Sequence, residues 1–189
     1  MNKTVGFALT GSFCTFRRAL ETLQELRRAG YEIIPIMSFN AYQLDTRFGE
    51  SAYFREELRR ITGSEIVHTI PEAEPIGPKK LLDALVICPC TGNTIAKLAA
   101  GVADTPVTLA AKSHLRNQRP VVIAVSTNDA LSAAAANIGA LKNRKNIFFV
   151  PFRQDDPREK PNSVVADFSK TAETLSAALE GRQIQPVML

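Results

Sequence analysis

Residues 84–94 read ALVICPCTGNT, and this stretch decides the class of fold. Its first five residues form an unbroken apolar run, which is typical of a strand buried on both faces, and the run is broken from Pro89 to Asn93. Residues 121–125 (VVIAV) repeat the pattern before a polar break at Ser126 to Asp129. Strands that are buried on both faces indicate a parallel sheet with helices on both sides.

Strand and helix alternate along the rest of the chain. Apolar periodicity and the Gly, Pro and Ser/Thr breaks predict strands at 4–9, 32–37, 84–88, 121–125 and 147–150, and helices at about 14–29, 50–61, 94–100, 104–115, 130–142 and 163–180. Pro35 favours a place near the sheet edge for the second strand. Residues 38–49 fit a polar loop or short helix, and the proline-rich stretch 65–78 fits a surface connection. This order predicts an α/β fold with a doubly wound, three-layer parallel sheet of the Rossmann-like kind.

The length and composition fit one domain over residues 1–189, which closes with a polar loop and a helix at about 151–189. The 23 basic and 19 acidic residues leave a net charge of +4 and are dispersed, which suits an anionic ligand better than nucleic acid. No apolar run approaches the ~20 residues of a membrane span. No secretory signal is recognisable either, so we expect a soluble, cytoplasmic protein.

The cysteines and histidines predict no metal site and no disulfide. Cys14, Cys88 and Cys90 lack the spacing of a zinc site, and an odd set of three suggests no disulfide framework. Cys88 ends a buried strand and is expected to be a core residue, whereas Cys90 falls in the predicted loop and is assigned no chemistry. His68 and His114 are interpreted as surface or packing residues rather than general bases.

Ligands of a doubly wound sheet bind beyond the carboxyl ends of its strands. Four breaks at those ends are rich in hydroxyl and amide side chains, namely Thr10-Gly11-Ser12, Ser38-Phe39-Asn40, Pro89 to Thr94, and Ser126-Thr127-Asn128. Two of them open into helices, whose free N–H groups favour phosphate. A structural alternative is that Ser12, Asn93 and Thr94 only cap helices. The Gly-x-Gly-x-x-Gly and Gly-x-x-x-x-Gly-Lys-Ser/Thr motifs are absent, which argues against a standard NAD domain and an NTPase.

Residues 89–105 (PCTGNTIAKLAAGVADT) resemble the Pro-Ala-Ser-Ala-Asn-Thr signature, followed by a helix and Gly-x-Ala-Asp, of the homo-oligomeric flavin-containing cysteine decarboxylases. Thr10-Gly11-Ser12 and Ser38-Phe39-Asn40-Ala41 resemble that family's flavin phosphate loop and its second flavin-contacting loop. The resemblance implies a flavoprotein fold with FMN as cofactor. It also implies assembly into trimers or multiples of trimers, with flavin sites at the boundaries between protomers.

Segments between about residues 5 and 167, including GSFCTF, FNAYQLDTRFGE and KNIFFVPFRQDDPREKPNSVVA, are more similar to one branch of that family. This branch holds the B subunits of a two-subunit enzyme that makes the pyridine dicarboxylate of bacterial endospores. The likeness implies an oxidoreductase subunit in the mother-cell cytoplasm of a spore-forming bacterium. It would oxidise a dihydropyridine dicarboxylate together with a separate A subunit, through which NAD(P) could enter.

Two departures from the decarboxylases argue against cysteine decarboxylation but are compatible with FMN binding. No histidine lies between Met1 and Val67, where the family has its catalytic histidine, and Ser126-Thr127-Asn128-Asp129 replaces the family's Pro-Ala-Met-Asn motif. Two alternatives stay open. One is an FMN-dependent decarboxylase or prenyltransferase relative, and the other is a non-catalytic subunit that binds flavin or product or scaffolds its partner.

Carried over position by position, the resemblance implies flavin contacts at Thr10, Gly11, Ser12, Ser38, Asn40, Thr91, Gly92, Thr94 and Ser126. Ser12 and the helix after it would bind the phosphate, while residues 91–94 would border the isoalloxazine ring. Asn93 is the catalytic candidate, because the matching family asparagine contacts the reacting ligand. A dianionic substrate favours arginine or lysine contacts. Arg47 is the leading candidate for these, followed by Lys97 and Arg116, with Asn128 as a further substrate-binding residue.

Overall fold

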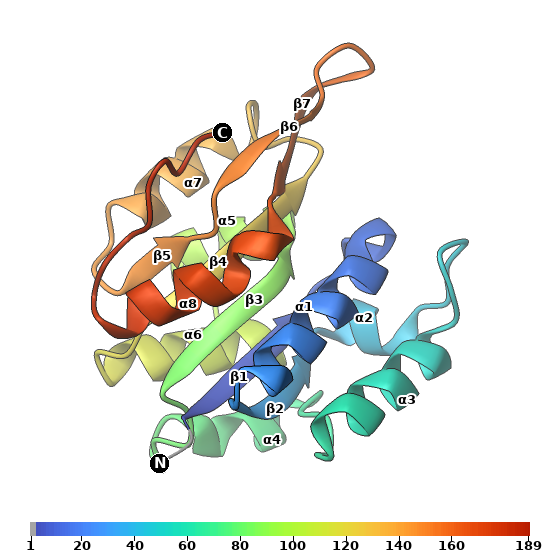
Figure 1. The fold of residues 1–189 in the computed structure, drawn as a ribbon, viewed down its shortest axis with the longest axis vertical. Helices are drawn as coiled ribbons and strands as arrows, with labels where there is room; N and C mark the ends of the chain where they lie inside the picture. The colour runs from blue at the N-terminus through green and yellow to red at the C-terminus, as the bar shows by residue number, and fades with distance from the viewer. Residues whose placement is uncertain (1–2) are drawn as a thin grey trace.

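The computed structural model describes residues 3–189, and its strands form one seven-stranded sheet (Figure 1). The strands are β1 (Thr4–Leu9), β2 (Glu32–Met37), β3 (Ala84–Cys90), β4 (Val121–Thr127), β5 (Ile147–Phe149), β6 (Phe152–Asp156) and β7 (Lys160–Ala166). Their order is β2-β1-β3-β4-β7-β6, and β5 pairs with β4 off this path. Strands β1 to β5 pair in parallel, which confirms the predicted α/β class with a mostly parallel sheet.

The direction of winding reverses between β1 and β3. From β1 the chain moves outward to β2, and it then returns past β1 to build β3 and β4 on the other side. Pro35 lies in β2, which is the edge strand on that side of the sheet. This confirms the prediction of an edge position, which was made because proline has no N–H to donate to a neighbouring strand. Neighbouring strands at such a switch point send their connections to opposite faces, which opens a crevice at their carboxyl ends.

The helices cover both faces of the sheet, which confirms the three predicted layers. They are α1 (Phe16–Arg28), α2 (Phe39–Gln43), α3 (Ser51–Thr62), α4 (Ile70–Ala73), α5 (Gly92–Ala100), α6 (Pro106–Arg116), α7 (Ala135–Lys142) and α8 (Thr171–Leu179), with short 3₁₀ turns at Phe13–Thr15, Glu74–Ile76 and Phe168–Lys170. Helices α1 and α8 pack together on one face, with α3 beside α1 (Figure 1). Helices α5, α6 and α7 lie on the other face.

The burial pattern explains why these segments form these elements. All seven residues of β3 are buried, as a strand covered on both faces requires. In α1 the buried positions include Phe16, Leu20 and Leu23, which recur at helical spacing on the side facing the sheet. Gly101 follows α5 with a φ of +74°, which is the left-handed conformation predicted for a C-terminal cap.

The segment after β5 differs from the prediction. Residues 151–162 were expected to be a polar loop and a helix was expected from 163, but β6 and β7 form a hairpin there and α8 begins only at Thr171. Strand β7 pairs antiparallel with β4, with Ser126 opposite Val165, and the sheet is therefore not wholly parallel. The prolines suggested a loop, but Pro157 lies in the turn of the hairpin and Pro161 is exposed in β7. Figure 1 shows the turn of the hairpin projecting beyond the rest of the fold.

Three smaller predictions of element bounds were also wrong. Strand β3 continues through Pro89 to Cys90 with a shift of register after Ile87, so Cys90 is a buried strand residue and not a loop residue. Helix α5 begins at Gly92 rather than 94, and α7 begins at Ala135 rather than 130. The proline-rich connection contains the short helical turns of α4 and Glu74–Ile76.

Burial also fixes the state of the two core cysteines. Cys88 and Cys90 have no solvent-exposed surface, and burial raises the pKa of both thiols well above the usual range. Both therefore stay protonated and act as small apolar residues, as expected for Cys88. Across residues 3–189, no helix combines the length and apolar character needed to cross a membrane.

Candidate functional site

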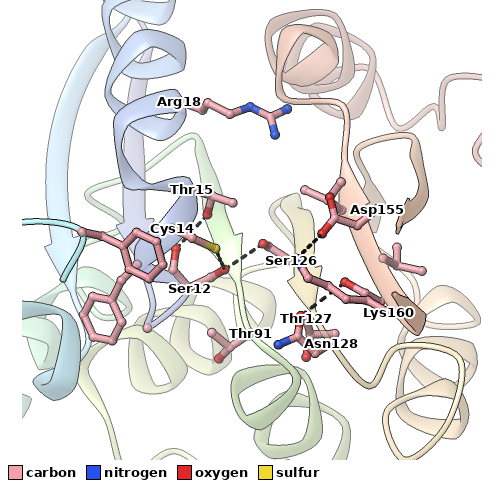
Figure 2. A pocket seen from close by; sticks show the side chains of 16 residues that line it. Ser12, Cys14, Thr15, Arg18, Thr91, Ser126, Thr127, Asn128, Asp155 and Lys160 are labelled. Atoms are coloured by element: carbon pink, nitrogen blue, oxygen red, sulfur yellow. Dashed lines mark hydrogen bonds and ion pairs between the residues drawn. The ribbon is translucent and has the colours of Figure 1, made fainter. Parts of the chain in front are cut away.

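Two cavities open where the carboxyl ends of the parallel strands meet. The larger, about 510 Å³, is bordered by residues that follow β1, β3 and β4 and by the β6–β7 hairpin (Figure 2). The smaller, about 290 Å³, is bordered by residues that follow β1, β2 and β3. Gly11 and Thr91 line both cavities, so the two spaces flank the switch point. Ligand pockets of proteins span roughly 300–1,000 Å³, and this edge is where the fold class binds ligands.

Most of the predicted site residues line one of these cavities. Those in the larger cavity are Gly11, Ser12, Thr91, Ser126 and Asn128. Those in the smaller cavity are Gly11, Ser38, Asn40, Thr91, Asn93, Thr94 and Lys97. The four polar breaks that are far apart in the sequence are thus brought to one edge.

Thr10 lies behind the cavities and joins the ends of β1 and β3. Its side chain is buried; its Oγ1 accepts a hydrogen bond from the N–H of Thr91 at 3.0 Å and donates one to the carbonyl of Pro89 at 2.9 Å. This pair of bonds holds the loop after β3 against β1. Thr10 is therefore placed to position the loop rather than to touch a ligand.

We expect Thr10→Val to destabilise the fold by about 1–3 kcal/mol, because the Thr91 N–H loses its partner while the shape of the side chain is kept. Urea unfolding would measure the change. The matched control is Thr22→Val in α1, whose buried hydroxyl donates to the Arg18 carbonyl one turn earlier and should cost less than about 1 kcal/mol. Equal losses in the two variants would show that Thr10 has no special role at the strand ends.

The side chains of Ser12, Asn93 and Thr94 do not cap the helices at this edge, so the structural alternative is not what the structure shows. The side chain of Thr91 caps α5 by accepting from the Thr94 N–H at 3.3 Å, and Ser38 caps α2 by accepting from the Ala41 N–H at 3.4 Å. Ser12 makes no capping bond; its Oγ lies 2.8 Å from Ser126 Oγ, across the gap between β1 and β4 (Figure 2).

The loop after β4 packs tightly against the start of α5. The Thr127 hydroxyl donates to Asp129 Oδ1 at 2.5 Å, and a Cβ at Gly92 would lie only 2.6 Å from that oxygen. Gly92 itself is buried and lines neither cavity. Its lack of a side chain therefore allows the two loops to approach each other.

The predicted cationic residues differ in where they lie. Lys97 lines the smaller cavity, but its Nζ contacts both carboxylate oxygens of Asp104 at 2.8 Å, and this hydrogen bond lowers the pKa of Asp104. Arg47 is exposed, with its guanidinium 4.8 Å from the ring centre of Phe48, which lines the larger cavity. Arg116 is the last residue of α6, whereas the smaller cavity reaches only Thr105 before the first turn of that helix. The structure therefore does not bring Arg116 to this edge.

Several residues of the larger cavity were not predicted from the sequence. Arg18 reaches it from α1, and Asp155, Lys160 and Ser163 reach it from the hairpin. Ser163 Oγ donates to Asn128 Oδ1 at 3.3 Å, which links the hairpin to the loop after β4. Local patterning did not predict this strand: its buried residues Ser163, Val164 and Ala166 do not alternate regularly with exposed ones, and the prolines favoured a loop.

Neither histidine lies in the site. His114 is buried in α6 with Nε2 3.1 Å from the Pro120 carbonyl, which indicates that this nitrogen carries the proton. His68 stacks on Tyr42 with ring centres 3.8 Å apart. Both are packing residues, as interpreted from the sequence. Within residues 3–189, no cluster of three or more His, Cys, Asp or Glu side chains is arranged to hold a metal.

The chemistry of the edge suits a phosphate-bearing ligand. Hydroxyl groups of Ser12, Ser38 and Ser126 and the amides of Asn40 and Asn93 supply neutral donors. A Cβ at Gly11 would contact only the Phe13 ring, at 3.6 Å or more, so a ligand can approach the backbone there. The N-terminal ends of α2 and α5 face the same edge and favour negative charge.

The doubly wound sheet with a ligand site at its switch point defines the class of fold, and comparison with known families gives the family within it. Residues 1–178 match the Flavoprotein family, to which the chain therefore belongs. The chain is 46% identical to the B subunit of dipicolinate synthase from Bacillus subtilis (strain 168) over 187 residues, which are 99% of this chain and 94% of that protein. This likeness confirms the resemblance to the branch of B subunits.

Solved structures of other proteins are similar to this chain, as the sequence comparison leads one to expect. The crystal structure of the dipicolinate synthase B subunit from Bacillus halodurans has a TM-score of 0.91 at 45% identity, covering 100% of this chain and 98% of that one. The FMN-dependent cysteine decarboxylase SpaF has a TM-score of 0.69 at 22% identity, covering 95% of this chain and 97% of that one. At that lower identity, the likeness to SpaF shows the shared fold alone.

Proposed function

We propose that this chain binds FMN across the switch point and works as the B subunit of a dipicolinate synthase. The observation that carries the proposal is the 46% identity to the corresponding Bacillus subtilis protein along 99% of the chain. The membership in the Flavoprotein family and the two cavities that meet at Gly11 and Thr91 support the cofactor.

In the proposed complex, the residues on either side of Gly11 and Thr91 would hold FMN. Ser12 and the turn after it, with Ser38 and Asn40 of the second loop, would donate to the phosphate and its neighbouring oxygens. Thr91, Asn93 and Thr94 would border the isoalloxazine ring, where protein groups tune the cofactor's electronics. Thr10 and Gly92 act from behind, by holding the loops in place. Ser126 contributes a hydroxyl through its bond to Ser12.

The proposed reaction is the oxidation of dihydrodipicolinate to dipicolinate together with a separate A subunit. Two electrons and two protons leave the substrate ring, which becomes aromatic. Bound FMN, or an oxidised nicotinamide held by the A subunit, would supply the two-electron acceptor. On this chain, Asn93 orients the substrate ring, while Arg47, Lys97 and Asn128 are the proposed contacts for its polar groups. Arg116 is left out because it lies away from the edge.

The proposal also covers the setting of the protein. The relevant compartment is the cytoplasm of the mother cell in a spore-forming bacterium, and we propose that the chain forms a homo-oligomer, a trimer or a multiple of one. The whole of residues 1–189 would act as one flavoprotein domain. Neighbouring copies of the chain or the A subunit would complete the active site.

Reconstitution tests this function. The purified chain should show flavin absorbance after incubation with FMN, and it should form dipicolinate from dihydrodipicolinate only when the A subunit and NAD(P)⁺ are added. Asn93→Ala should lower that rate at least about tenfold with FMN still bound, because the substrate loses its orientation. The matched control is Asn137→Ala in α7, which lines neither cavity and should keep the full rate.

The alternatives give different results. Dipicolinate formed at the same rate by the A subunit alone would contradict a role for this chain in the reaction. A chain that stays colourless with added FMN would contradict the cofactor. Decarboxylation of a cysteinyl compound by the flavin-bound chain would instead favour the decarboxylase relatives.

A further inference from the structure

Arg18 is a cation that the sequence patterns did not single out, and it borders the larger cavity. It is the third residue of α1, one turn beyond the loop after β1. Its guanidinium carbon lies 4.9 Å from the ring centre of Phe168, in the 3₁₀ turn that precedes α8. Figure 2 shows the side chain extending from α1 above Ser12 and Ser126, towards the C-terminal elements of the fold. Arg18 is an exposed residue, and the aromatic face attracts its guanidinium by a cation–π contact.

The side-chain donors of Arg18 have no partner among residues 3–189. Within that part of the chain its guanidinium makes no hydrogen bond or ion pair, and the side-chain hydrogen bond at this residue is one that its backbone carbonyl accepts from the Thr22 hydroxyl. The two lysines that border the cavities are different. Lys97 is bound to Asp104 at 2.8 Å and Lys160 to Asp155 at 3.2 Å. Among these three cations, Arg18 is the one with no carboxylate of residues 3–189 within 4 Å, although Glu21, Glu25 and Asp167 border a third cavity, of about 150 Å³, beside it.

A guanidinium held by one face keeps its N–H edges free. Those edges form a planar fork that matches two oxygens of one carboxylate or phosphate. Ser12 and Ser126 line the same cavity, and because their hydroxyls share one hydrogen bond, one of the two protons stays available to such an anion. The shared chemistry is therefore an oxyanion, either a carboxylate of the substrate or the phosphate of the flavin.

We propose that Arg18, stacked on Phe168, binds a carboxylate of the dicarboxylate substrate. This inference rests on the function proposed above. In it, Arg18 is the residue that selects a negatively charged substrate. Arg18 does not line the smaller cavity, where Ser38, Asn40 and Asn93 lie. It shares the larger cavity with Asn128 and the hairpin residue Lys160. Ser12, a proposed phosphate contact, lines this cavity too, so the substrate is favoured by the two neighbours Asn128, a proposed substrate contact, and Lys160, a second cation.

Binding of FMN and of dipicolinate, measured separately, distinguishes the two anions. Arg18→Gln should leave the Kd for FMN within about twofold and weaken the binding of dipicolinate to the FMN-loaded chain by about 10- to 100-fold, as expected for a lost charge-assisted pair. Arg18→Lys should fall between, since it keeps the charge but loses the fork. Titration calorimetry gives both constants, and circular dichroism checks that the variants are folded.

Arg17→Gln is the matched control. Arg17 is the exposed neighbour on α1, lines neither cavity, and lies 6.0 Å from the ring centre of Tyr53. The control removes the same charge, and we expect unchanged binding of both ligands. Pyridine-2-carboxylate has one carboxylate fewer than dipicolinate. If Arg18 holds the second carboxylate, replacing Arg18 should reduce the affinity for pyridine-2-carboxylate less than the affinity for dipicolinate.

The outcomes separate this inference from the proposed function. If the wild type forms dipicolinate with the A subunit but Arg18→Gln and Arg17→Gln bind dipicolinate alike, the role of Arg18 is wrong and the function stands. If Arg18→Gln loses FMN instead, the anion is the flavin phosphate and the inference is overturned. If the wild type neither binds nor makes dipicolinate, both proposals fail.

Discussion

The Gly92→Ala variant is expected to lose about 1–3 kcal/mol of folding free energy, because an added Cβ has no room where the loop after β4 meets α5. That Cβ would lie 2.6 Å from Asp129 Oδ1 and 2.7 Å from Thr127 Oγ1. Both side chains would have to turn away, although the Thr127 hydroxyl holds the Asp129 carboxylate. Thr127 lines the larger cavity, so we also expect FMN to bind at least about tenfold more weakly, which corresponds to about 1.4 kcal/mol.

Chemical denaturation and FMN titration measure the two effects. The control is Gly139→Ala, the same change in the middle of α7, where a Cβ would meet nothing within 4 Å. Alanine there should stabilise the fold by roughly 0.5–1 kcal/mol, because glycine loses more backbone entropy in a helix. If Gly92→Ala behaves like Gly139→Ala, the close approach of the two loops is not a constraint on the site.

Acidification from pH 6.5 to 4 is expected to remove about 3 kcal/mol of stability through His114 alone. Burial lowers the pKa of His114 to about 4 from an ordinary value of 6.5, which means that the folded protein keeps the ring neutral. The unfolded chain takes up the proton below pH 6.5, whereas the folded chain does so only near pH 4. The contribution of the neutral His114 ring to the free energy of unfolding is therefore fully present above about pH 6.5. It is lost as the pH falls from about 6.5 to about 4.

Urea unfolding at a series of pH values would measure this loss. His114→Gln provides the comparison, because an amide can donate to the Pro120 carbonyl as the imidazole does and does not titrate. Carboxylates with lowered pKa values, such as Asp104 and Glu72, destabilise both proteins in acid and cancel in the difference. A wild type and a variant that lose stability in parallel between pH 6.5 and 4 would contradict the assignment to His114.

Much of the site could be predicted because it follows from local patterns. The apolar runs of β3 and β4 are unbroken, and each ends in a polar break, so the breaks had to share the carboxyl edge of a parallel sheet. Ser38 and Asn93 were placed at that edge in this way. The role of Thr91 as the cap of α5 is equally local, since it depends on the residue three positions later.

Two other predictions failed for different reasons: distant segments decide the hairpin, whereas the position of Arg116 follows from the length of its own helix. Pro157 and Pro161 were interpreted as signs of a loop, but β7 gains hydrogen bonds from β4 and the hairpin forms despite them. Arg116 was grouped with Lys97 by charge alone, yet the length of α6 separates Arg116 from the edge. A pattern of charges along the sequence carries no information on which end of a helix faces a cavity.

The sequence by itself determined the doubly wound sheet, the edge at which ligands bind and the hydroxyl and amide groups that gather there, because apolar periodicity and strand ends are local properties. Only the tertiary structure decided that Gly92 packs against the Thr127–Asp129 loop, that the hairpin lines the larger cavity, and that Arg18 stacks on Phe168 with its side-chain donors unpaired within the described residues. These contacts join residues far apart in the chain. Their geometry follows from how the layers pack, which no local pattern records.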